Sequence, residues 1–140
     1  MKERINDKIN QIELFLEELF PMVPETFEDY KQDLGSKAAC ERYFEKIIEA
    51  CVDLAFLIIR ENKFKMPEDD ESSFIILFQN NIISEELSKK LRDAKSMRNI
   101  IVHEYGEIDD EKVFNSIKEE LENDVNEFID NMREIINKVY

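Results

Sequence analysis

The chain contains only two glycines and three prolines among its 140 residues. This is about a third of ordinary usage, and a β-sandwich or β-barrel needs many more turns than so few such residues can make. The scarcity of turn formers therefore favours a few long helices. Hydrophobic residues make up 43% of the chain and charged residues 37%, a balance that fits neither a disordered segment nor a membrane protein. We expect a single soluble helical domain over residues 1–140.

Apolar residues repeat at spacings of three and four in four long segments, which is typical of amphipathic helices. Pro21 ends the first segment, and Ser36 is a natural N-cap for the second, whose apolar stripe is wide enough for a central position. Ser84 and Asp109 are expected to cap the third and fourth helices. The four expected helices cover residues 3–20, 36–62, 84–105 (with Gly106 just beyond) and 109–140.

Shorter segments lie between the long helices. Residues 27–34 predict a turn of helix that Gly35 interrupts, and residues 65–71 contain a proline and four consecutive acids, as in an exposed loop. Residues 73–78 form a short apolar run, for which periodicity alone leaves helix and strand open. We prefer a helix there because nothing nearby offers a strand partner. The sequence thus predicts an all-α fold: an antiparallel four-helix bundle with one or two additional short helices.

The net charge of −14 repels polyanions at long range. It argues most strongly against duplex DNA, because a long DNA footprint needs a Lys or Arg at each phosphate contact. A small site with one or two arginines survives this objection. No signal peptide or membrane-spanning run follows the charged start at residues 1–4. We therefore expect a cytoplasmic protein without a membrane contact.

The inventory of chemically specific motifs is narrow. The sequence has no glycine-rich phosphate loop and none of the common zinc or hydrolase signatures. Cys40 and Cys51 lie about 16 Å apart along one helix, which excludes a disulfide between them and predicts two buried thiols. The acidic clusters at residues 68–71 and 109–111 lack the spacing of a calcium loop and are interpreted as solvated surface. We expect no cofactor and no metal.

One segment, residues 98–105, concentrates the remaining polar chemistry and contains the chain's single histidine. Arg98 falls on the apolar stripe of its helix, where a charged side chain needs a partner. Tyr105 returns to the same stripe seven residues later, and Asn99 and His103, four residues apart, meet on the adjoining face. Together these residues present Arg, Asn, His and Tyr over one joined arc.

Position alone also allows a purely structural interpretation of this segment. Arg98 would then bind a carboxylate of the bundle, such as Asp53 or Glu49, and His103 would interact with the C-terminal end of its own helix. Tyr105 would be an aromatic packing residue at the end of the apolar stripe.

The pattern Arg-x-x-x-x-His-x-Tyr, with Asn99 directly after Arg98, resembles the signature of the HEPN superfamily and particularly of its HepT-like toxins. Residues 41–55 are similar to the second helix of that family, and residues 74–84 to its short middle helix. Residues 108–109, after the motif, also fit. The resemblance therefore covers about residues 36–110. The first and last expected helices resemble those of the family only in being long amphipathic helices.

The resemblance implies a metal-independent ribonuclease that acts through the ribose 2′-hydroxyl and is paired with a minimal nucleotidyltransferase antitoxin. The residues suit this chemistry. Histidine has an ordinary pKa near neutral, so His103 can move the proton. Arg98 offers a planar two-pronged donor to the charge that develops on the phosphate, which Asn99 can position. One histidine does not easily serve as both base and acid, but a two-fold homodimer with both motifs in one cleft supplies two.

In the HepT-like branch, the tyrosine two residues after the histidine resembles the acceptor of adenylyl groups that the antitoxin transfers. The resemblance therefore assigns Tyr105 as the modified residue. Each added nucleotide would bring negative charge and bulk to the RNA cleft and block it.

Two other classes of protein remain open at this point. The main alternative is a non-catalytic HEPN subunit that binds a nucleotide, or a partner, for a nucleotidyltransferase and shares the same four residues. The other is a purely structural helical dimer. The charge of −14 favours these two classes, whereas the presence of both Arg98 and His103 at the family spacing favours the ribonuclease.

Overall fold

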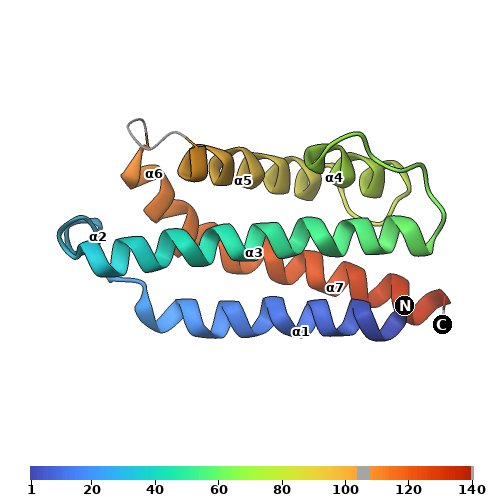
Figure 1. The fold of residues 1–140 in the computed structure, drawn as a ribbon, viewed down its shortest axis with the longest axis horizontal. Helices are drawn as coiled ribbons and strands as arrows, with labels where there is room; N and C mark the ends of the chain where they lie inside the picture. Colours follow the sequence, from blue (N-terminus) through green and yellow to red (C-terminus); the bar gives the residue numbers. More distant parts are fainter. Residues whose placement is uncertain (104–107, 140) are drawn as a thin grey trace.

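The computed structural model describes residues 1–103 and 108–139, and within them it contains helices and no strand. Four long helical segments run alternately in opposite directions, with both chain ends at the same end of the bundle (Figure 1). This confirms the antiparallel four-helix bundle. The long segments are α1 (Lys2–Leu19), α3 (Leu34–Glu61), α5 (Glu85–His103) and a last helix composed of α6 (Asp110–Asn115), η2 (Ser116–Glu120) and α7 (Leu121–Val139). The shorter elements are η1 (Phe20–Met22), α2 (Phe27–Gln32) and α4 (Asp70–Gln79).

The predicted central position of the second long helix is confirmed. Helix α3 contacts α1, α2, α4 and α5, and its wide apolar face contributes to one continuous cluster of buried side chains. Cys40 and Cys51 are free and fully buried on this helix, as expected. Burial raises the pKa of the Cys51 thiol to about 12. None of the described helices is long and apolar enough to cross a lipid bilayer.

The predicted caps of the helix that carries the motif and of the helix that follows it are confirmed. The Ser84 hydroxyl oxygen accepts a hydrogen bond from the Leu87 backbone N–H at 3.0 Å, at the start of α5. A carboxylate oxygen of Asp109 accepts one from the Lys112 N–H at 3.1 Å, at the start of α6. Each bond satisfies a backbone donor that the first helical turn leaves without an intrahelical partner.

The predicted start of α3 at Ser36 is wrong by two residues. Asp33 is the N-cap: its carboxylate accepts the Ser36 backbone N–H at 3.1 Å and the Ser36 hydroxyl at 2.8 Å. These hydrogen bonds lower the pKa of Asp33. An aspartate is as good an N-cap as a serine, so the helix begins earlier and Gly35 lies inside its first turn instead of separating two helices.

The acidic segment before α4 is only partly a loop. Asp69 caps α4 by accepting the Ser72 N–H at 2.8 Å, and Asp70 and Glu71 already belong to the first helical turn. Carboxylates are favourable there because they face the positive end of the helix dipole. The apolar run at 73–78 is helical, as preferred, and not a strand.

The last helix contains a π-helical segment, η2, which the sequence analysis did not predict. In this last helix, four buried residues follow one another at intervals of four positions: Val113, Ile117, Leu121 and Val125. On an α-helix of 3.6 residues per turn, each such step drifts by about 40° around the axis. A wider π turn cancels part of this drift, so all four side chains remain in the core.

Candidate active site

The predicted site lies on the C-terminal half of α5, beyond the end of α4 (Figure 1). Helix α4 covers the earlier part of α5, where the Ser88 hydroxyl donates to the Phe74 carbonyl at 3.1 Å and Lys95 lies 3.2 Å from Asp70. The first turn of α4 thus lies beside Lys95 and Ser96. The segment from 98 to 103 extends past it, next to α3.

Arg98 points toward α3 and is only 15% exposed. Its Nη2 lies 3.4 Å from Glu49 Oε2 and 4.0 Å from Glu45 Oε1. These carboxylates supply the partner that a cation on the apolar stripe needs. Of the two carboxylates expected in the structural interpretation, Glu49 is therefore in contact with Arg98, whereas Asp53 lies 3.6 Å from Lys8 of α1.

Two N–H donors of the Arg98 guanidinium differ in whether they have a hydrogen-bond partner. Nη1 donates to the side-chain oxygen of Asn99 at 3.3 Å, so the asparagine that follows Arg98 in the sequence also contacts it in space. Nε is buried and has no hydrogen-bond partner in the structure. The guanidinium is therefore held by Asn99 and Glu49 and retains hydrogen-bonding capacity.

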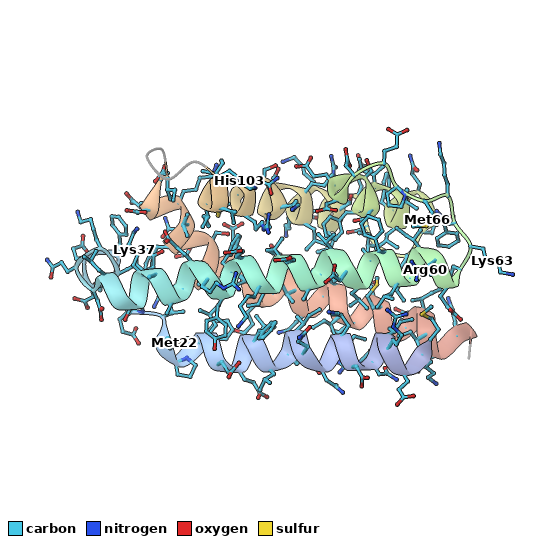
Figure 2. All side chains as sticks on the ribbon, in the orientation of Figure 1. Met22, Lys37, Arg60, Lys63, Met66 and His103 are labelled. Atoms are coloured by element: carbon cyan, nitrogen blue, oxygen red, sulfur yellow. The ribbon has the colours of Figure 1, made fainter. Side chains whose placement is uncertain are left out.

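His103 is the last described residue of α5 and is exposed at that end of the helix (Figure 2). Among the described residues, no hydrogen bond or ion pair involves its imidazole. It lies five residues after Arg98, about 7.5 Å further along the helix axis. Tyr105 and Gly106, which the sequence analysis placed just beyond, lie outside the described residues.

Sequence reasoning missed two residues of this site, Arg42 and Glu45 on α3. Arg42 Nη1 donates to Glu45 Oε1 at 2.9 Å, and the same carboxylate faces Arg98 from across the helix pair. The signal was present, because Arg42, Glu45 and Glu49 stand at helical spacings of three and four and so share one face of α3. Only the antiparallel packing of α3 on α5 shows that this face meets Arg98.

A cavity of about 510 Å³ lies on the other side of α5, against the last helix. Met97 and Ile101 line it from α5, and Ser116 and Glu120 line it from the π-helical segment. Arg98, Asn99 and His103 are not among its lining residues. The cavity is therefore separate from the predicted catalytic residues.

In the part of the chain that the structure describes, no group of three or more His, Cys, Asp or Glu side chains is placed to hold a metal ion. The polar groups in contact with one another at the site are two guanidiniums, two carboxylates and one amide, and the exposed imidazole of His103 follows five residues further along α5. Such a set can bind a phosphate and move a proton.

A sequence model described as ribonuclease HepT-like matches residues 5–133 of the chain. The chain belongs to the HepT-like family. This confirms the resemblance on which the sequence analysis relied, and it also confirms the expected class of enzyme, because the family is one of ribonucleases. The match extends well beyond residues 36–110 and includes most of α1 and most of α7.

Two curated relatives of this HepT-like chain are nucleases. The mRNA nuclease HepT of Shewanella oneidensis is 35% identical over 101 residues, which cover 72% of this chain and 75% of the relative. The tRNA nuclease HepT of Aphanizomenon flos-aquae is 27% identical over 113 residues, which cover 81% of this chain and 77% of the relative.

Solved structures of toxin–antitoxin complexes share the fold. A tri-AMPylated HEPN toxin of Shewanella oneidensis in complex with an MNT antitoxin superposes with a TM-score of 0.89 at 30% identity, covering 96% of this chain and 99% of that one. A toxin–antitoxin with AMP-PNP gives a TM-score of 0.86 at 29% identity, covering 93% and 97%. The HepT-like fold of this chain is thus that of these toxins over nearly its whole length.

Proposed function

We propose that this HepT-like chain is an endoribonuclease toxin that cleaves RNA at a site formed by Arg98, Asn99 and His103, without a metal ion. The observation that carries the proposal is the Arg98 guanidinium, which Asn99 and Glu49 hold at the open end of α5, one and a half turns before the exposed His103. The nuclease names of the curated relatives support the same activity.

In this mechanism each group has one task. The imidazole of one His103 takes the proton of the ribose 2′-hydroxyl, and the 2′-oxygen attacks the adjacent phosphorus. Arg98 donates hydrogen bonds to the phosphate oxygens as charge develops on them, and Asn99 orients the guanidinium. A second histidine gives a proton to the departing 5′-oxygen, so the bond to that oxygen breaks as a neutral alcohol forms.

The second histidine comes from a second copy of the chain. Each chain has a single histidine, and a two-fold homodimer that faces both motifs into one cleft provides the base and the acid together. We take residues 1–140 as one HEPN-like domain of such a dimer, acting in the cytoplasm, where its RNA substrates are.

A minimal nucleotidyltransferase antitoxin is the proposed partner, and Tyr105 is the proposed acceptor of the adenylyl groups that it transfers. The AMPylated toxin and the MNT antitoxin in one of the similar solved structures support this pairing. Modification so close to His103 in the sequence adds negative charge beside the site where an RNA phosphate must bind.

One observation favours a second candidate, the non-catalytic HEPN subunit of a nucleotidyltransferase. Arg98 is already paired with Glu49 and faces Glu45, and the chain carries a charge of −14. A phosphate must therefore compete with two carboxylates for the guanidinium. Such a subunit would bind a nucleotide or partner at this surface and would leave RNA intact.

The two candidates are separated by cleavage assays with the purified protein in excess chelator. The wild type is expected to cleave RNA, and His103→Ala and Arg98→Ala are each expected to lower the rate at least a hundredfold, as for the loss of a general acid–base or of a transition-state donor. Lys89→Ala is the control, since Lys89 is exposed on the same helix and, within the described residues, forms an ion pair with Asp93 alone. Cleavage that requires Mg²⁺, or that survives in His103→Ala, contradicts the proposal.

A further inference from the structure

Two arginines on neighbouring helices face one carboxylate oxygen at the site. Arg42 Nη1 of α3 lies 2.9 Å from Glu45 Oε1, and Arg98 Nη2 of α5 lies 4.0 Å from the same atom. Because both approaches end on a single oxygen, one anion in the place of the Glu45 carboxylate would reach both guanidinium groups. The geometry therefore defines an anion position between the two arginines.

The exposure of these side chains indicates which of their ion-pair contacts a phosphate can replace. Arg98 and Glu45 are 15% and 19% exposed, whereas Arg42 is 63% exposed. Because the Arg42 guanidinium is largely solvated, its ion pair with a residue three positions along the same helix contributes little to stability. The Arg42–Glu45 contact is therefore weak enough for a phosphate to replace, while Arg98 remains held by Glu49 and Asn99.

A simpler interpretation makes Arg42 and Glu45 an ordinary surface pair. Lys89–Asp93, four residues apart on α5, is such a pair. The difference is that Glu45 also faces a largely buried arginine from another helix. That second contact places the pair beside Arg98, at the end of α5 that α4 leaves uncovered.

We propose that Arg42 is a second phosphate-binding residue, which holds the backbone of the RNA substrate together with Arg98, and that Glu45 is the counter-ion that the phosphate displaces. This inference rests on the proposed ribonuclease function and names a further residue of the same site. Two arginines around one phosphate also explain how a chain of net charge −14 can hold RNA: the attraction is local, and Glu45 neutralises it when RNA is absent.

The test measures binding of a 5′-labelled single-stranded RNA by fluorescence anisotropy, with every variant made in the His103→Ala background. Arg42→Ala is expected to weaken binding roughly tenfold and to reduce the salt slope of log K by about 0.7, the value for one lost phosphate contact. Glu45→Gln is expected to tighten binding several-fold because it removes the competing charge. Arg42→Lys is expected to restore part of the affinity and the salt slope.

The matched controls are Arg133→Ala and Glu13→Gln. Arg133 and Glu13 form another arginine–glutamate ion pair, 2.7 Å apart, between α7 and α1, far in sequence from Arg98. Each control is expected to change RNA affinity less than twofold. With His103 intact, Arg42→Ala should raise KM about tenfold and leave kcat within about threefold, since a contact that only holds the phosphate is made equally in the bound substrate and in the transition state.

The outcomes separate the inference from the function on which it rests. If the wild type cleaves RNA and Arg42→Ala binds it as tightly as Arg133→Ala does, Arg42 is not a phosphate ligand and the inference fails alone. Glu45→Gln that binds RNA no more tightly than Glu13→Gln overturns the counter-ion role. A wild type that neither binds nor cleaves RNA overturns both the inference and the proposed function.

Discussion

Lys95 Nζ lies 3.2 Å from Asp70 Oδ2, and this ion pair joins the middle of α5 to the first turn of α4. The lysine is 8% exposed and the aspartate 50%, so the positive charge is the more desolvated partner. The pair lies at the N-terminal end of α4, and the segment of Arg98 and His103 continues along α5 beyond it.

Asp70→Ala should therefore destabilise the protein. The substitution leaves Lys95 buried without a counter-ion, and we expect a loss of about 1–2 kcal/mol in the free energy of unfolding, less than for a fully buried pair because Asp70 is half exposed. Urea denaturation measures it. Lys95→Met, which removes the buried charge itself, should cost less. The interpretation fails if Lys95→Met is the more damaging of the two.

Much of this fold followed from the sequence because the burial of apolar stripes drives folding more strongly than any other interaction. The four long helices follow from such stripes, and the caps at Ser84 and Asp109 follow from the preference of these side chains for accepting backbone N–H groups at a helix start. The start of α3 was missed because aspartate and serine are equally good N-caps. The sequence therefore does not show whether Asp33 or Ser36 caps the helix. The π-helical segment was missed because a helix expected from spacing alone gives no account of the angular drift that builds up over three successive intervals of four residues.

The residues of the candidate site likewise fall into two groups: those that a local motif predicts and those that only the packing of helices brings to the site. Arg98, Asn99 and His103 stand out within one helix, so a local motif identifies them. Glu45 and Arg42 belong to another helix, and their relevance depends on which face of α3 meets α5. Lys95 shows the same limit, since nothing in its local sequence indicates that Asp70 of another helix neutralises it. Contacts between helices are set by packing, which a single motif does not encode.

The two cysteines should be unreactive in the native protein. Burial raises the pKa of Cys40 to about 11 and that of Cys51 to about 12, so almost no thiolate is present at pH 8. A disulfide-exchange reagent should modify neither thiol in native protein and both in guanidinium chloride.

The same pKa values fix the sign of a pH effect. Because the folded state favours the neutral thiols, its stability is complete below the ordinary thiol pKa of about 8.5 and falls as the pH rises toward 11. In urea denaturation, Cys51→Ala should flatten part of this fall between pH 8 and 10. An unchanged slope would show that the thiol is not the titrating group.

The ribonuclease mechanism needs a homodimer with both His103 residues in one cleft. Analytical ultracentrifugation at micromolar concentration should give twice the chain mass of 16.7 kDa. A spin label placed on each chain through His103→Cys should report a short distance across the dimer. A monomer, or a dimer with these two positions on opposite outer faces, contradicts the composite site.

Tyr105 should be the adenylylated residue. Incubation with ATP, Mg²⁺ and a partner nucleotidyltransferase is expected to add one or more AMP units to the wild type, as intact-mass analysis would show. Tyr105→Phe should gain no mass and remain an active toxin that the partner no longer neutralises by modification. The same mass gain on Tyr105→Phe, or none on the wild type, would remove this assignment and favour the non-catalytic subunit.

The most direct measurement of the central claim is cleavage, in chelator, of an RNA oligonucleotide and of the same oligonucleotide with a single 2′-deoxy substitution at the cleaved position. Attack by the 2′-oxygen predicts that the RNA yields a 2′,3′-cyclic phosphate and a 5′-hydroxyl, and that the substituted strand is not cut at that position. Arg98→Ala and His103→Ala should leave both strands intact. Cleavage of the deoxy-substituted strand at an undiminished rate would contradict the account.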